Sequence, residues 1–181
     1  MIGIRKGRQM KLFSGKIGII SSEIARMLMD DGDIETDSPE EVELDIQAVL
    51  KEYLRTDKEL TEKAKDFCEK RGWPLSSYHK VKRKLAERQR FIVGDEAVDY
   101  IMEQVIGAFM HSQFVEEIYS EDHDLKRKMR GVLRRHTDIE DEIDEEARAK
   151  IKNLEEGTRD WEIEYARAMD LVKRRRGLIE S

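Results

Sequence analysis

The sequence predicts an all-α protein made of two tandem, related helical modules of about four helices each, joined by a short apolar linker. Three observations support this prediction. Apolar residues recur at steps of three and four along most of the chain, which is the spacing of one face of an α-helix. Only two prolines, Pro39 and Pro74, interrupt the sequence, so few positions exclude a helix. Charged residues make up 41% and hydrophobic residues 39%, which predicts charge-rich helices that bury narrow apolar stripes.

The first predicted module covers residues 10–90 and contains four helices. Its helices are expected to begin at residues whose side-chain oxygens accept hydrogen bonds from free backbone amides. The first helix spans about 16–30. The residues expected to begin the later helices are Ser38 with Pro39, Thr56 or Asp57, and Ser76 or Ser77. Gly72-Trp73-Pro74 separates the third helix from the fourth, because proline restricts the residue before it.

The second predicted module covers residues 91–178 and begins with the short apolar link 91–94. The residues expected to begin its first three helices are Asp95, Ser120 and the capping box Thr137-x-x-Glu140. Gly157 ends the third helix, and Gly177 ends the fourth. Residues 1–9 are expected to be a flexible or start-site extension.

The two modules share an ordered series of apolar positions. With an offset of 82, apolar residues of helix 16–30 fall on apolar residues of the helix that follows Asp95. With an offset of 83, Val42, Ile46 and Leu50 fall on Leu125, Met129 and Leu133. This series predicts that the chain arose by duplication.

The C-terminal part of the sequence carries three distinctive segments, and a fourth lies near the start. They are Ile143-Asp144-Glu145-Glu146-Ala147-Arg148-Ala149-Lys150-Ile151, Glu156-Gly157-Thr158-Arg159-Asp160-Trp161, Lys173-Arg174-Arg175-Arg176-Gly177 and Met10-Lys11-Leu12. With these segments the chain resembles the bacterial family called domain of unknown function 507 over residues 10–178. The resemblance implies a small helical bacterial cytoplasmic protein. It implies no activity and supplies no catalytic residues.

Cysteine content and hydropathy bound the compartment. Cys68 is the only cysteine, so an internal disulfide cannot form, and a reducing compartment is expected. No apolar run approaches the roughly 20 residues that a membrane-spanning helix needs. We therefore expect a cytoplasmic protein that does not insert into a membrane.

No pattern in the sequence indicates a cofactor, a metal or a catalytic site. None of the four histidines belongs to the Glu-x-x-His pair of helical di-iron sites. The acidic segment 30–41 lacks the ligand and glycine spacing of a calcium-binding EF-hand. Cys68 lies on an apolar stripe, which favours a buried structural thiol over a nucleophile. The phosphate-binding and nucleophile motifs that contain glycine at fixed spacing are absent. We therefore expect no enzyme and no cofactor.

The charge distribution is the remaining functional signal. The net charge is −6, but residues 70–90 carry eight basic residues and one acid, and residues 126–135 carry six basic residues and none. Residues 30–45 carry nine acids and no base. Such segregation creates local fields that the net charge conceals. The candidate binding residues are Lys80, Arg83, Lys84, Arg88, Arg127, Arg130, Arg134, Arg174 and Arg175.

Three functions remain open. The favoured one is a non-catalytic helical interaction or adaptor protein that binds an acidic partner or associates with itself. The basic stripes could instead contact the phosphates of a nucleic acid, which predicts binding that weakens steeply with salt. An enzyme of unrecognised type is the third possibility, and it would need a pocket with converging polar groups. A competing interpretation is that the basic blocks pair with acidic segments of the same chain.

Overall fold

The computed structural model describes residues 10–179, apart from the side chains of residues 140 and 141, so the predicted extension at 1–9 lies outside the described residues. Within this range the chain is all-α, as predicted, with one small antiparallel pair of strands. The elements in chain order are η1 (Ser14–Lys16), α1 (Ile17–Asp30), β1 (Ile34–Glu35), α2 (Pro39–Arg71), η2 (Leu75–Ser77), α3 (Tyr78–Arg88), α4 (Ala97–His111), β2 (Glu117–Ile118), α5 (Asp122–Thr137), α6 (Glu140–Lys150) and α7 (Arg159–Arg175).

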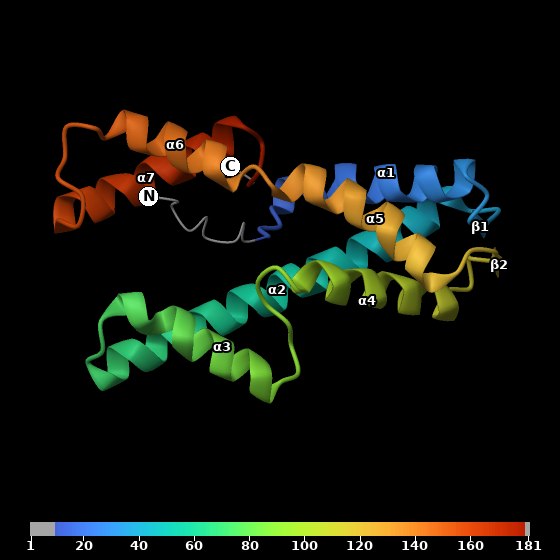
Figure 1. Ribbon diagram of the computed structural model, residues 1–181, viewed down its shortest axis with the longest axis horizontal. Helices are drawn as coiled ribbons and strands as arrows, with labels where there is room; N and C mark the ends of the chain where they lie inside the picture. Colours follow the sequence, from blue (N-terminus) through green and yellow to red (C-terminus); the bar gives the residue numbers. More distant parts are fainter. Residues whose placement is uncertain (1–9, 180–181) are drawn as a thin grey trace, which may run out of the picture.

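Four helical segments form a central bundle, and two hairpins extend from one end of it (Figure 1). The bundle consists of α1, the first half of α2, α4 and α5. At the other end of the bundle β1 pairs with β2, with Ile34 opposite Ile118 and Glu35 opposite Glu117. The second half of α2 packs on α3 as the first hairpin, and α6 packs on α7 as the second. The two hairpins therefore lie on the side of the molecule away from the strands.

One apolar core joins the bundle helices. Ile24 of α1, Leu50 of α2, Ile101 of α4 and Leu133 of α5 are all fully buried in the same cluster. Residues before and after position 90 contribute to it, so the bundle helices of the two predicted modules share one core. Each hairpin adds a small cluster of its own, and the residues of these two clusters are Ala64, Cys68 and Val81, and Ala147, Ile151 and Ala168.

The segment before α1 attaches the second hairpin to the bundle. Phe13 is 3% exposed and packs with Ile143, Val172 and Leu178 of the second hairpin and its C-terminal turn. The backbone amide of Gly15 donates to the carbonyl of Leu178 at 2.8 Å. The start and the end of the described chain are therefore joined directly.

The prediction of separate helices on either side of Thr56 is wrong. α2 continues without interruption from Pro39 to Arg71. Its buried residues keep helical spacing across the expected break, since Tyr53 and Leu60 are separated by two turns on one face. Burial of a continuous stripe outweighs the local preference of Thr56 and Asp57 for a helix start. α2 ends where Gly72 adopts the left-handed conformation, with a φ of 65°.

Several predicted caps are also wrong in detail. α6 begins at Glu140 with Ile139 as its cap residue, while Thr137 is the last residue of α5. The buried hydroxyl of Thr137 has no hydrogen-bond partner among the described residues, so the expected capping box does not form. Helices α4 and α5 begin after Glu96 and Glu121 instead of after Asp95 and Ser120, and neither cap residue caps with its side chain. These shifts of one or two residues are typical of helix ends.

Candidate binding cleft

A cleft of about 520 Å³ lies where the first hairpin leaves the bundle. Its walls come from segments that are far apart in the sequence. They are the chain start at 10–14, α2 between Tyr53 and Lys65, the first turns of α3, the link at 93–94, Lys173 of α7 and Ile179. Its size falls within the range of roughly 300–1,000 Å³ that is typical of ligand-binding pockets.

The side chains around the cleft are predominantly cationic. Among the described residues, five lysines and one arginine line it, against a single carboxylate, Asp57; the six cations are Lys11, Lys58, Lys65, Lys82, Arg83 and Lys173. Asp57 is already neutralised, because its carboxylate lies 2.7 Å from the ammonium group of Lys82. The cleft therefore carries an excess of positive charge in a chain whose net charge is −6.

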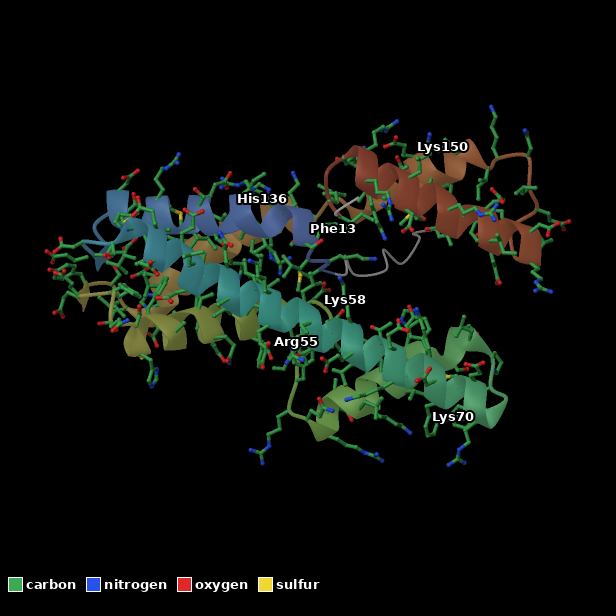
Figure 2. The ribbon with its side chains drawn as sticks, turned by 180° about the vertical axis from the view of Figure 1, so that it is seen from behind. Phe13, Arg55, Lys58, Lys70, His136 and Lys150 are labelled. Carbon is green, nitrogen blue, oxygen red and sulfur yellow. The ribbon has the colours of Figure 1, made fainter. Side chains whose placement is uncertain are left out.

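Two of the cations have no ion-pair partner among the described residues. Lys58 and Arg83 are exposed, and neither forms an ion pair with any residue that the structure describes. Figure 2 labels Lys58 on α2 close to where the helix leaves the bundle. Lys65 is held more firmly, with its ammonium group 3.5 Å from Glu62 and 5.6 Å from the ring centre of Tyr78. Because Lys58 and Arg83 have no internal counter-charge, a bound anion would not have to displace one.

Five apolar residues also line the cleft, and we call them its floor. It contains Met10, Leu12, Phe13, Leu54 and Val93, of which Leu12 and Phe13 are buried. The ring of Tyr53 is stacked on Phe91 with 4.8 Å between the ring centres.

Tyr53 fixes this floor and does not act as an acid. Its hydroxyl donates to the carbonyl of Ile92 at 3.1 Å. Burial, and after it the negative charge of Asp57, raises the pKa of Tyr53 far above its usual value. The side chain therefore stays neutral over the physiological range of pH.

The predicted basic residues of the first hairpin separate into two sets. Arg83 lines the cleft. Lys80, Lys84 and Arg88 lie outside its lining, on the exposed side of α3. None of these three forms an ion pair with a residue in the described range 10–179, so this part of the basic block 70–90 stays unneutralised.

Most of the predicted basic residues of α5 form ion pairs with acidic residues of the same chain. Arg127 lies 3.0 Å from Asp124 in the same helix, and Arg130 forms an ion pair with Asp99 of α4. Neighbouring cations of the same helix form ion pairs with other parts of the bundle as well. They are Lys126 with Glu103 of α4, Arg135 with Glu23 of α1, and Lys128 with Asp31 and Asp33 in the loop after α1. Arg134 has no ion pair among the described residues. The basic block of α5 therefore serves mostly to join bundle helices.

The two candidates in α7 lie on the second hairpin, outside the cleft lining. Arg175 forms an ion pair with Glu146 of α6, and Arg174 forms none with a described residue. Lys173, the residue before them, is the one that reaches the cleft.

The opposite end of the molecule is acidic and internally braced. Asp33 is buried, and its carboxylate accepts hydrogen bonds from Lys128 at 2.7 Å and from Ser120. Burial by itself would raise the pKa of Asp33, but these two hydrogen bonds outweigh it and leave the pKa below its usual value. On the exposed surface beside the strands, the charge of Asp37 raises the pKa of Glu116. Carboxylates therefore gather at the strand end, while the cleft at the first hairpin is lined mainly by cations.

The part of the chain that the structure describes contains no cluster of three or more His, Cys, Asp or Glu side chains arranged to hold a metal ion. The thiol of Cys68 is buried within the first hairpin. Across residues 10–179, no helix has the length and apolar content to cross a membrane.

A family model described as "Protein of unknown function (DUF507)" matches residues 10–178. The chain belongs to this family. The match covers nearly all of the described residues, including both hairpins and every residue of the cleft except Ile179. No curated protein matches the chain. Membership of DUF507 brings no established activity with it, so the function has to be argued from the cleft.

Sequence reasoning found one of the six cleft cations, Arg83, and missed the others. Lys58 and Lys65 lie in a stretch of α2 where acids and bases alternate, so the local charge is unremarkable. They lie two turns apart on one helical face, at the spacing i and i+7, which is the only local signal that they act together. Lys11, Lys82 and Lys173 reach the cleft only because the chain folds back on itself.

Proposed function

We propose that this DUF507 protein is a non-catalytic interaction protein that binds an acidic segment of a partner protein in the basic cleft. The observation that carries the proposal is that the exposed, unneutralised cations Lys58 and Arg83 line the same cleft as the apolar residues Leu54 and Val93. Charged rims around apolar centres are the usual arrangement of protein interfaces. The charge selects the partner and sets its orientation, and the floor supplies buried apolar area.

The apolar floor favours a polypeptide over a nucleic acid. A nucleic acid presents phosphates along its whole length, and proteins that bind it supply mainly cations and hydrogen-bond donors. A peptide that alternates acidic and apolar side chains can occupy the rim and the floor together. Lysines outnumber arginines by five to one in the cleft, and lysine acts as a point charge without the planar fork that suits phosphate.

Single-stranded nucleic acid is the second candidate, because an aromatic ring lies among the cations. Tyr78 lines the cleft, and its ring centre is 3.9 Å from that of His79. Stacking of bases on such rings is common in proteins that bind single strands. This candidate predicts binding that falls steeply with salt and does not depend on apolar side chains in the ligand.

The enzyme hypothesis has less support from the cleft. Asp57, the only carboxylate that the described residues bring to the cleft, is paired with Lys82, and the hydroxyl of Thr61 donates to the carbonyl of Asp57 at 2.9 Å. Neither group is placed as a base beside a nucleophile. We therefore keep catalysis as a prediction without assigned residues.

The test is fluorescence anisotropy with two labelled probes, a peptide of alternating glutamate and leucine and a single-stranded oligo(dT). We expect the wild type to bind the peptide. The double variant Lys58→Glu/Arg83→Glu should bind it at least about ten-fold more weakly at low salt. The matched control is Lys150→Glu/Lys152→Glu, which makes the same change in net charge at exposed positions outside the cleft lining.

The outcomes separate the candidates. Equal peptide binding by the two double variants would refute the assignment to the cleft. A nucleic acid would replace the protein partner if the wild type binds oligo(dT) but not the peptide. That binding would also have to fall steeply with salt and be lost in the Lys58→Glu/Arg83→Glu variant. Binding of neither probe would contradict both proposals.

A further inference from the structure

The turn of the first hairpin exposes large apolar side chains. We call residues 70–84 the α2–α3 tip. Within it Trp73 is 50% exposed and Leu75 is 61% exposed, and Phe67 lies next to it at the end of α2. The ring of Trp73 meets that of Phe67 edge-on at 5.6 Å, and its backbone amide donates to the carbonyl of Cys68 at 2.9 Å. The indole is therefore held outward at a fixed place instead of folding back onto the hairpin.

Basic residues flank Trp73 and Leu75 in the sequence, and the nearest acid before them is Glu69. Between Lys70 and Ala86 the sequence contains six basic residues and no acidic one. Lys70 and Arg71 end α2, and Lys80 and Lys84 are exposed on α3. Figure 2 shows Lys70 at the far end of the hairpin, where α2 turns toward α3. The tip therefore combines an exposed Trp and an exposed Leu with basic residues and no acid between Lys70 and Ala86.

The second hairpin offers an internal comparison. Its tryptophan, Trp161, is stacked on Tyr165 with 4.7 Å between the ring centres, and the guanidinium of Arg148 lies 5.3 Å from its ring. The turn before it contains Glu155 and Glu156. Tryptophan is thus covered and close to acids in the second hairpin, whereas in the first hairpin it is exposed and close to cations.

We propose that the α2–α3 tip attaches the protein peripherally to an anionic lipid surface. Tryptophan is enriched where membrane meets water, because its ring is apolar and its N–H stays hydrated. Clusters of Lys and Arg are attracted to anionic lipids. The tip is the end of a hairpin (Figure 1), and Trp73 and Leu75 are exposed there outside the cleft lining, so a flat, deformable surface fits these two side chains better than a peptide does. Such contact needs no spanning helix. The tip shares Tyr78, His79, Lys82 and Arg83 with the cleft lining, while Lys58 belongs to the cleft alone.

The experiment uses the full chain with the substitution Trp161→Phe, so that Trp73 is the only tryptophan. Vesicles of phosphatidylcholine, with and without about 30% phosphatidylserine, are added while the emission of Trp73 and co-sedimentation are measured. The expected result is a blue shift and co-sedimentation with the anionic vesicles only. The variant Trp73→Ser/Leu75→Ser is expected to bind at least about ten-fold more weakly.

Two further variants keep the test decisive. Lys80→Glu/Lys84→Glu leaves the apolar residues in place and is expected to weaken vesicle binding at least about ten-fold. Lys150→Glu/Lys152→Glu changes the net charge equally on the second hairpin, and Leu44→Ser removes a leucine that is 51% exposed on the bundle; both are expected to bind as the parent does. Circular dichroism confirms that each variant is folded.

Three results would overturn the proposal. They are an unshifted Trp73 emission with anionic vesicles, equal binding by the tip variants and the controls, and a change of oligomeric state caused by Trp73→Ser/Leu75→Ser. The last result, measured by sedimentation equilibrium, would make the tip an interface between copies of the chain. Because the vesicles contain no peptide, failure here would leave the peptide-binding result intact.

Discussion

Gly15 is the position where a single methyl group should loosen the joint between the second hairpin and the bundle. A Cβ at Gly15 would lie 2.0 Å from the carbonyl oxygen of Gly177 and 2.8 Å from the carbonyl carbon of Leu178. Both are backbone atoms, so the C-terminal turn would have to retreat by at least about 1 Å. That movement would break the hydrogen bond from Gly15 to Leu178 and disturb the packing of Phe13.

The expected cost of Gly15→Ala combines two terms. Overpacking at a close contact costs about 1–3 kcal/mol, and loss of the hydrogen bond costs about 0.5–1.5 kcal/mol. We therefore expect the free energy of unfolding to fall by about 2–4 kcal/mol. The assay is urea denaturation followed by circular dichroism, with hydrogen exchange of the α6 and α7 amides to show whether the hairpin opens first.

Gly18→Ala is the matched control. Gly18 lies in α1 with nothing within 4 Å of its added Cβ, so alanine should raise stability by up to about 1 kcal/mol through helix propensity. Equal stability of Gly15→Ala and Gly18→Ala, or unchanged exchange in α6 and α7, would refute the close approach of the two chain ends.

Three further predictions follow from single side chains. Thr137→Val should raise the free energy of unfolding by about 1 kcal/mol, because the buried Thr137 hydroxyl has no partner among the described residues; a denaturation midpoint below that of the wild type would contradict this. The folded pKa of Asp33 is lowered, so its contribution is present above the unfolded pKa and is lost as pH falls through the folded value. The difference in stability between the wild type and Asp33→Asn should therefore shrink as pH falls below the unfolded pKa of about 3.9, and a difference that grows on acidification would refute the assignment. Cys68 is fully buried, so a thiol reagent should label it only as fast as the first hairpin opens, and rapid labelling without urea would show that the hairpin is open.

The helices could be predicted because their buried stripes are local in sequence. Ile24 and Leu28 in α1, and Met129 and Leu133 in α5, are all fully buried, as their spacing indicates. Helix boundaries were less predictable. A serine or threonine can cap a helix, but whether it does depends on what the adjacent turns bury, and Thr56 lies inside α2 because Tyr53 and Leu60 share a buried face.

The cleft could not be predicted from sequence for a different reason. Its cations come from positions 11, 58–65, 82–83 and 173, and proximity of such distant positions is a property of the fold. The most basic segments were misleading guides. The block of α5 is mostly neutralised by contacts such as Arg130 with Asp99 and Lys128 with Asp33, which no charge count can show.

The strands bear on the predicted duplication. Adding 83, the offset found from apolar residues alone, to the bounds of β1 gives the bounds of β2, and adding it to Pro39 at the start of α2 gives Asp122 at the start of α5. The β1–β2 pair is antiparallel, as two equivalent strands are when a twofold axis relates the halves. The bundle then resembles a homodimer whose copies have been joined into one chain.

Fusion of this kind would explain why the two hairpins differ. In a homodimer every substitution appears in both copies, so the two hairpins must carry the same surface. In a joined chain each hairpin can change alone. Trp73 is exposed among cations in one, while Trp161 is covered by Arg148 near acids in the other. The duplication stays a prediction, but it gives a physical reason why the first hairpin could acquire a binding surface while the second kept its paired charges.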